Sequence, residues 1–180
     1  GYDAGSGAPF SVSEFVAWPT LTQWLARTPL QPPMVARVLQ SLAQVMDPAH
    51  QAQLCHGALK PTNVFVSPGG EGQVRVTDFG ASVVRSTSPT HEAYAQSAPW
   101  WAPEQLNASA VLGPATDIFA VGLLAFYALT GRSFWVSCQA ATPDLKAWQQ
   151  EVMGPRPLAS ARARELGAVV NPALDVAFER

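Results

Sequence analysis

The chain of 180 residues is long enough for about one domain with a sizeable hydrophobic core. Hydrophobic residues make up 48% of it and charged residues 13%, a composition that excludes an intrinsically disordered chain. The net charge is −2 and there is no run of Lys or Arg, so charge does not point to nucleic acid or to an anionic membrane surface as a partner.

The longest apolar stretch and the cysteines bear on where the protein works. The stretch from Ile118 to Leu129 is shorter than the roughly 20 residues of a membrane span, so we interpret it as a buried helix. Cys55 and Cys138 predict reduced thiols and a cytoplasmic location. The histidines form no zinc-ligand spacing with them. Because the chain starts at Gly1 and ends in the uncapped sequence ALDVAFER, we expect an interior fragment of a longer protein.

The first half of the chain predicts one strand, two helices and a hairpin. Residues Phe10 to Val16, FSVSEFV, alternate apolar and polar side chains, which is typical of a strand. Pro19 opens a short amphipathic helix, TLTQWLAR, and a longer helix starts near Pro32. The turn SPGGEG separates VFV from QVRVTDF, which predicts a hairpin of two apolar strands.

The second half predicts a long loop followed by helices. Residues 81–99 lack apolar periodicity and indicate a loop. An apolar helix follows from Thr116 to Leu129, capped near Thr116 or Ala115 and ended by Gly131. Further helices are predicted over residues 144–153, 158–166 and 173–180. The predicted fold class is therefore α+β, mainly α, with one short β-hairpin among helices.

Four short segments stand out, and they follow one another as HGALKPTN (56–63), TDFG (77–80), APE (102–104) and DIFAVG (117–122). Together they resemble the C-terminal lobe of a protein kinase of the serine/threonine type, in a bacterial-like form. In that family the catalytic loop is HRDLKxxN, the metal loop is DFG, the substrate loop ends in APE, and the central helix begins DxxxxG. A single three-letter match arises by chance, whereas all four in order make the resemblance specific.

The resemblance extends over essentially the whole chain. It implies that residues 1–16 are the end of the N-lobe strand and the hinge, and that residues 17–180 are the helical C-lobe, truncated before its last helices. The backbone of Glu14 and Val16 is then where adenine would hydrogen-bond, and Phe65 lies under the base. The glycine-rich loop, the strand lysine and the helix glutamate of the N-lobe do not occur in these residues.

The same resemblance implies roles for residues around the catalytic loop. Asp78 would bind a Mg²⁺ ion that bridges the phosphates of ATP, and Asn63 would hold a second ion, since hard cations prefer oxygen ligands. Lys60 would neutralise the transferred phosphate and contact Ser97, which stands in the substrate loop. These residues make up the phosphate side of a kinase site.

Four further residues have structural roles by the same resemblance. His56 and Phe79 match the stack of side chains that ties the two lobes together, and Asp117 would anchor this stack by accepting hydrogen bonds from the catalytic-loop backbone. Glu104 pairs in the family with an arginine that would follow residue 180. We therefore expect Glu104 to be unpaired in this chain.

Two substitutions in the catalytic loop decide what the site can do. The aspartate that accepts the proton of the substrate hydroxyl is replaced by Ala58, and general-base catalysis contributes on the order of 10²–10⁴-fold. No nearby carboxylate replaces it, because Asp78 is committed to the metal and Glu71 belongs to the hairpin turn. Gly57 replaces the arginine that holds a phosphorylated activation loop in many kinases. We therefore expect negligible turnover.

These residues leave several functions open. The first is a pseudokinase that binds ATP and Mg²⁺ in its full-length form, weakly or not at all as this chain alone, and acts on a protein partner as a scaffold or signalling component. The alternative is an active serine/threonine protein kinase that phosphorylates a protein substrate by an atypical mechanism, since positioning and electrostatics supply most of phosphoryl-transfer catalysis. A small-molecule phosphotransferase fits less well, because those relatives lack APE and the DxxxxG helix. A binding module without a nucleotide is the last alternative.

Overall fold

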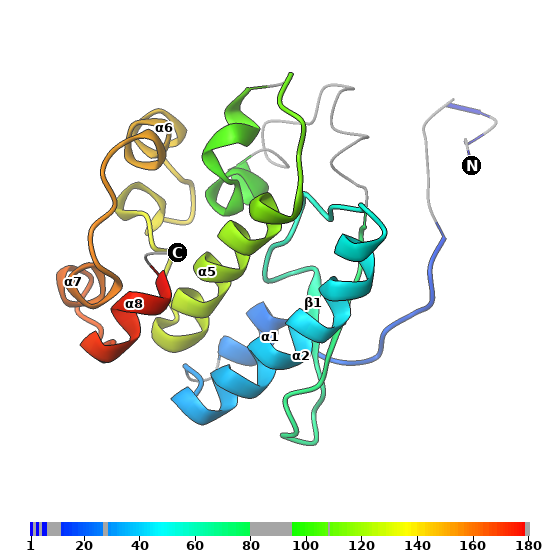
Figure 1. Cartoon of the computed structure of the whole chain (residues 1–180), viewed down its shortest axis with the longest axis horizontal. Coiled ribbons are helices and arrows are strands. Elements are labelled where there is room, and N and C mark those ends of the chain that lie inside the picture. The colour runs from blue at the N-terminus through cyan, green and yellow to red at the C-terminus, as the bar shows by residue number, and fades with distance from the viewer. Residues whose placement is uncertain are drawn as a thin grey trace.

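The computed structural model describes residues 1, 3, 5, 6, 12–26, 29–79, 95–107 and 109–178. Helices make up most of this structure, with one two-stranded sheet beside them (Figure 1). In chain order the elements, with η for 3₁₀-helices, are α1 (Leu21–Leu25), α2 (Pro32–Gln51), β1 (Val64–Val66), β2 (Val74–Val76), η1 (Ala98–Trp100), η2 (Pro103–Leu106), α5 (Pro114–Thr130), η3 (Val136–Cys138), α6 (Leu145–Met153), α7 (Ala159–Glu165), η4 (Pro172–Leu174) and α8 (Asp175–Phe178). The predicted fold class, α+β and mainly helical with a short hairpin, is confirmed.

Helices α2 and α5 form the main core. Pro32 and Pro33 start α2, because their fixed φ angle suits the first helical turn and their missing N–H is not needed there. The apolar residues of α2 that recur at helical spacing are buried, namely Val35, Val38, Leu42 and Met46. Leu124 of α5 belongs to the same cluster, and fully burying such a side chain contributes about 1.5–3 kcal/mol. Since Asp117 lies in the first turn of α5, this packing also positions the site.

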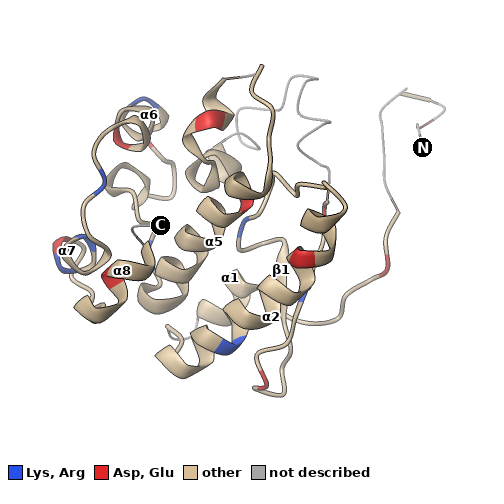
Figure 2. Cartoon of the chain, viewed as in Figure 1, with Lys and Arg blue, Asp and Glu red and all other residues tan. Residues whose placement is uncertain are grey.

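A second cluster of buried residues lies between α5 and the C-terminal helices. The ring of Phe134 packs edge-to-face against Phe126 at 5.1 Å and against Trp135 at 5.2 Å, and such pairs add about 0.5–1.5 kcal/mol each. Trp148 of α6 is fully buried in this cluster. Figure 2 shows that the charged residues are few and spread over the helices. Apolar contacts therefore dominate the stability of this part.

Strands β1 and β2 form an antiparallel hairpin whose open end leads into the HGALKPTN and TDFG segments. The register pairs Val64 with Val76. Beyond that pair, the backbone N–H of Thr77 donates to the carbonyl oxygen of Asn63 at 3.0 Å. The residue before β1 and the residues after β2 are therefore held beside each other.

Most predicted elements are confirmed. The hairpin, the long helix near Pro32 and the helix over residues 144–153 are present, the last with Asp144 as its N-cap. Gly131 ends α5 with a φ of 69°, a left-handed conformation that glycine adopts without strain. The start of α5 differs from the prediction: the cap residue is Gly113 and the helix begins at Pro114, which a first helical turn tolerates. The last predicted helix is reduced to η4 and α8, and residues 179–180 lie outside the described residues.

The strand predicted over Phe10 to Val16 is wrong for its described part. Residues 12–16 form no strand, and the first strand-like pairing in the described chain comes after them, as an isolated bridge between Thr20 and Phe65. Backbone N–H and C=O groups form a strand only against a neighbouring strand. The alternating pattern does not supply that neighbour. Residues 10 and 11 lie outside the described part.

The loop predicted over residues 81–99 is wrong at its C-terminal end. Residues 95–97 form a helical turn that continues into η1. Ala98 and Pro99 are buried, and Ala98 belongs to the cluster around Phe126. Packing against α5, which local periodicity does not reveal, orders this part. Residues 81–94 lie outside the described residues.

In the part of the chain that the structure describes, no helix combines the length and the apolar character that crossing a membrane requires.

Candidate functional site

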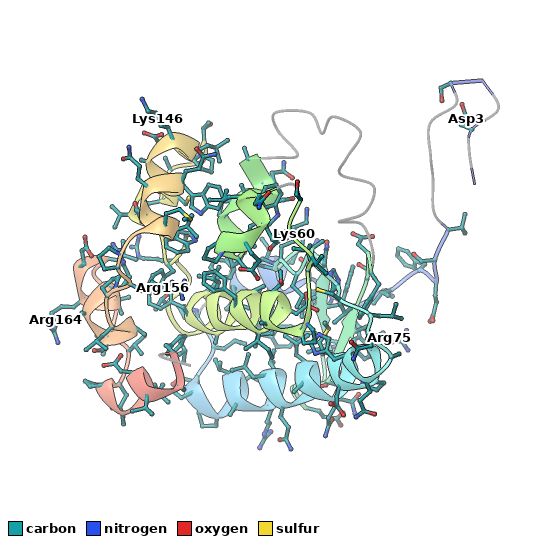
Figure 3. The ribbon with its side chains drawn as sticks, turned by 45° about the horizontal axis from the view of Figure 1, so that its top comes forward. Asp3, Lys60, Arg75, Lys146, Arg156 and Arg164 are labelled. Atoms are coloured by element: carbon teal, nitrogen blue, oxygen red, sulfur yellow. The ribbon has the colours of Figure 1, made fainter. Side chains whose placement is uncertain are left out.

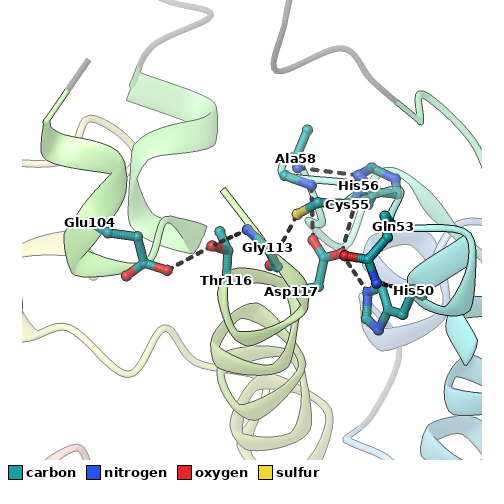
Figure 4. A network of polar contacts seen from close by, with 10 residues as sticks. His50, Gln53, Cys55, His56, Ala58, Glu104, Gly113, Thr116 and Asp117 are labelled. Atoms are coloured by element: carbon teal, nitrogen blue, oxygen red, sulfur yellow. Dashed lines mark hydrogen bonds and ion pairs between the residues drawn. The ribbon is translucent and has the colours of Figure 1, made fainter. Parts of the chain in front are cut away.

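The carboxylate of Asp117 joins three parts of the chain (Figure 4). It is only 1% exposed. Its Oδ2 accepts a hydrogen bond from the backbone N–H of His56 at 2.9 Å, and its Oδ1 accepts one from Gly57 at 2.8 Å. Nε2 of His50, near the end of α2, lies 2.8 Å from Oδ2. The start of α5, the end of α2 and the HGALKPTN segment therefore meet at one buried negative charge.

The imidazole of His56 bridges the HGALKPTN and TDFG segments. Its Nε2 lies 2.8 Å from the carbonyl oxygen of Thr77, which can only accept, so Nε2 carries the hydrogen. Its Nδ1 accepts a hydrogen bond from the backbone N–H of Ala58 at 3.1 Å. Burial lowers the pKa of His56, against smaller opposing effects of the Thr77 carbonyl and Asp117. The ring of Phe79 lies 4.6 Å away. His56 is therefore a neutral link between the two segments.

Stability is expected to fall as the pH drops below about 6.5, the ordinary pKa of histidine. Below that pH the unfolded chain takes up a proton on His56 that the folded chain, with its lowered pKa, does not. The free energy of unfolding should then fall by up to about 1.4 kcal/mol per pH unit. Urea unfolding at about pH 7.5 and about pH 5.5 measures this, and the His56→Gln variant should lose less on acidification. An equal loss in both proteins would rule out His56 as the source.

Lys60 and Ser97 are brought together, as Nζ of Lys60 donates to Oγ of Ser97 at 3.1 Å. Between the catalytic-loop histidine and this lysine stands Ala58, which is 4% exposed. The backbone of Ala58 is held on both sides, because its N–H donates to His56 and its carbonyl oxygen accepts from Nδ2 of Asn63 at 3.1 Å. The loop is therefore fixed around a position that carries only a methyl group.

Asn63 and Asp78 flank the open end of the hairpin. Because Nδ2 of Asn63 donates to the carbonyl of Ala58, the amide is oriented and its Oδ1 remains an acceptor. Asp78 is exposed and has a φ of 64°, an uncommon conformation outside glycine that concentrates at functional sites. Oxygen donors of these two kinds fit Mg²⁺. The described residues contain no group of three or more His, Cys, Asp or Glu that could hold a metal alone, so further ligands would have to come from water or phosphates.

The segment predicted to hold adenine runs along the hairpin. The carboxylate of Glu14 lies 2.8 Å from the guanidinium of Arg75 in β2, and the two side chains are 78% and 47% exposed, so the pair contributes little stability. Phe65 of β1 is half-buried and bridges to Thr20, and Val16 is half-buried. The structure thus places the carboxylate of Glu14 beside Arg75 of β2, the residue that pairs with Phe65 of β1.

The expectation of an unpaired Glu104 is wrong. Its Oε1 accepts a hydrogen bond from Oγ1 of Thr116 at 2.7 Å, in the first turn of α5 (Figure 4). The expectation considered only the charged partner of the family, whereas a hydroxyl group on the adjacent helix satisfies this carboxylate.

Three residues of this network have no signal in the sequence. His50 contacts Asp117, Nε2 of Gln105 donates to the carbonyl of Gly57 at 2.8 Å, and the Cys55 thiol donates to the carbonyl of Gly113 at 3.2 Å. Burial raises the pKa of Cys55 to about 12, with the charge of Asp117 adding to it, so this thiol is not a nucleophile at neutral pH. Only the folded chain brings these side chains to the catalytic loop.

Comparison with known proteins agrees with this geometry. Residues 9–164 match the family model described as protein kinase domain. Similar proteins are the serine/threonine-protein kinases PrkC of Bacillus subtilis (32% identical, covering 79% of this chain and 24% of that protein), Pkn1 of Myxococcus xanthus (35%, 72% and 19%) and PknL of Mycobacterium tuberculosis (31%, 73% and 34%). The chain thus spans between about a fifth and a third of the length of these curated relatives. With its four motifs in order and a matching C-lobe fold, the chain belongs to the protein kinase family.

Proposed function

We propose that this domain is a pseudokinase that binds ATP and Mg²⁺ and acts through a protein partner in signalling. The observation that carries the proposal is the methyl group of Ala58 inside an otherwise ordered catalytic loop. Kinase catalysis needs a group that orients the acceptor hydroxyl and takes its proton, and no described side chain replaces it. The catalytic function that is lost is therefore the one that acts on the acceptor hydroxyl of the substrate.

The nucleotide side supports the same proposal. Lys60, Asn63 and Asp78 are present, and the backbone hydrogen bond from Thr77 to Asn63 holds the two metal-side residues near each other. Asp78 and Asn63 would hold Mg²⁺ through oxygen atoms, and Lys60 would neutralise phosphate charge. When bound, the metal would compensate the charge of the phosphates. The residues 1–16 would be the hinge that contacts adenine, and residues 17–180 the C-lobe.

The proposed location is supported by the thiols. Cys55 and Cys138 are both free, and burial raises the pKa of Cys138 to about 11. Free, unreactive thiols suit a reducing compartment. We propose a cytoplasmic location on this basis.

The alternative is an active protein kinase with an atypical mechanism. It is favoured by the serine/threonine kinase names of the similar proteins and by the order of the loop around Lys60. Positioning and electrostatics supply most of phosphoryl-transfer catalysis, so loss of a base reduces the rate without setting it to zero. Turnover by the natural sequence separates the two proposals.

Binding of Mg²⁺ and ATP to the full-length protein is expected to raise its unfolding temperature, because a ligand at a hundred times its Kd adds about 2.7 kcal/mol. A thermal-shift titration measures this, and the shift should disappear in Asp78→Ala. Asp47→Ala, which removes an exposed aspartate on α2, serves as control and should keep the shift. No shift in the natural protein would leave a binding module without a nucleotide as the better description. The same shift in Asp78→Ala would contradict the role of Asp78 in holding the metal.

A further inference from the structure

The hairpin has one face in the core and one face turned away from it. Val64, Val66 and Val74 are buried in the main core cluster. Phe65 and Arg75 alternate with them along β1 and β2, and the register pairs these two residues directly. Directly paired residues of an antiparallel hairpin lie on the same face of the sheet. The aromatic ring proposed to lie under the base and the guanidinium of Arg75 therefore share the face that is turned away from the core.

Arg75 contacts the segment before α1 at two points. Its Nη1 donates to Oε1 of Glu14 at 2.8 Å, and its guanidinium carbon lies 4.9 Å from the centre of the Trp18 ring. The second distance is within the range of a cation–π contact, about 6 Å. Figure 3 shows Arg75 on the side of the molecule along which the N-terminal segment runs. One side chain of β2 therefore contacts both ends of residues 14–18.

The backbone fixes this segment only at its C-terminal end. The N–H of Val66 donates to the carbonyl oxygen of Pro19 at 2.9 Å, and Thr20 forms the isolated bridge with Phe65. No described residue offers residues 14–18 a backbone–backbone hydrogen bond. The position of residues 14–18 relative to Phe65 therefore depends on side-chain contacts.

We infer that Arg75 is a positioning residue of the nucleotide site. By pairing with Glu14 and contacting the ring of Trp18, it fixes the backbone of the segment that would contact adenine. That backbone then stands beside Phe65, the residue proposed to lie under the base. This inference rests on the proposed function, in which the domain binds ATP. Exposed ion pairs and cation–π contacts add little to stability, but they change affinity when they decide how often the binding-competent arrangement is populated.

Titrations of the full-length protein with ATP and with inorganic triphosphate, both with Mg²⁺, separate the two ends of the ligand. Arg75→Ala should raise the Kd of ATP by about three- to tenfold, because each lost contact is worth up to about fivefold. The Kd of triphosphate should stay unchanged, because this ligand has no base to contact residues 14–18. Arg75→Lys keeps a cation for Glu14 and should raise the Kd of ATP less than Arg75→Ala does.

Glu14→Gln tests the sign of the effect. Removal of a negative charge would by itself tighten the binding of an anionic ligand through long-range attraction. Loss of the pair with Arg75 should instead weaken ATP binding, by up to about fivefold. The double variant of Glu14→Gln with Arg75→Ala should bind ATP no more weakly than Arg75→Ala alone, because both changes remove the same ion pair.

Arg164→Ala is the matched control. It removes an exposed arginine of α7, which Figure 3 shows on the opposite side of the molecule from Arg75. This variant loses the same charge as Arg75→Ala without a contact to residues 14–18. It should change neither the Kd of ATP nor that of triphosphate.

A spectroscopic measurement tests the contact without any nucleotide. In full-length protein that carries fluorinated tryptophan, the fluorine NMR signal that is absent from Trp18→Phe belongs to Trp18. Arg75→Ala should shift this signal and leave the other signals in place, whereas damage to the fold would move many of them. Arg164→Ala should leave all of them in place.

Three results would overturn the inference. They are an unchanged Trp18 signal in Arg75→Ala, an unchanged Kd of ATP in that variant, and an equal rise in the Kd of ATP and of triphosphate. Failure of the proposed function gives a different result. The natural protein would then bind neither ligand, which overturns the nucleotide role of Arg75 as well, while the Trp18 signal would still shift in Arg75→Ala.

Discussion

Replacing Ala58 with aspartate is expected to raise phosphoryl transfer by the full-length protein by about 10²–10⁴-fold, the contribution of a general base. The surrounding loop is already ordered. The backbone N–H of Ala58 donates to His56, its carbonyl accepts from Asn63, and Lys60 contacts Ser97. The carboxylate is therefore the missing part, and transfer of labelled phosphate to a generic protein substrate measures its return.

A matched variant separates proton acceptance from side-chain size. Ala58→Asn adds a side chain of the same shape that does not accept a proton and should stay near the background rate. Because Ala58 is buried, urea unfolding of both variants shows whether the fold survives. Equal rates for the Asp and Asn variants, with both folded and binding ATP, would show that the site lacks more than its carboxylate.

Asp117→Ala is expected to give the largest loss of stability. The substitution leaves the buried backbone N–H groups of His56 and Gly57 without an acceptor and removes the partner of His50. Each unsatisfied buried donor costs about 1–3 kcal/mol, so the free energy of unfolding should fall by about 2–6 kcal/mol. Urea unfolding at neutral pH measures the change.

Two control variants show whether the loss of stability comes from the hydrogen bonds of Asp117 or from the removal of a negative charge. Asp47→Ala removes an exposed carboxylate from α2 and should change stability by no more than about 0.5 kcal/mol. Asp117→Asn keeps the shape but directs an NH₂ group toward backbone donors, so it should also be strongly destabilising. A small effect of Asp117→Ala, similar to that of Asp47→Ala, would contradict the role of this carboxylate as the link between α5 and the catalytic loop.

Elements with strong local patterns could be predicted from the sequence. The helix after Pro32, the hairpin and the end of α5 at Gly131 follow from apolar spacing, turn residues and a left-handed cap, all encoded within a few residues. The segment FSVSEFV has an equally clear pattern, but its described residues form no strand, because strand formation also depends on a neighbour elsewhere in the chain.

The candidate site likewise has a part that could be predicted from the sequence and a part that could not. The motif residues could be placed from their order in the chain, since the resemblance gives each a position. The contacts of His50 with Asp117, of Glu104 with Thr116 and of Gln105 with Gly57 join residues whose spacing has no meaning before the chain folds.

The most direct measurement is phosphoryl transfer by the natural full-length protein, assayed with Mg²⁺ and labelled ATP beside the Asp78→Ala variant. If the domain binds nucleotide but lacks a carboxylate that directs the acceptor, both proteins should give a signal at background. This holds under conditions in which the natural protein binds ATP. Transfer clearly above background that is abolished by Asp78→Ala would contradict the proposal and identify the domain as an active kinase.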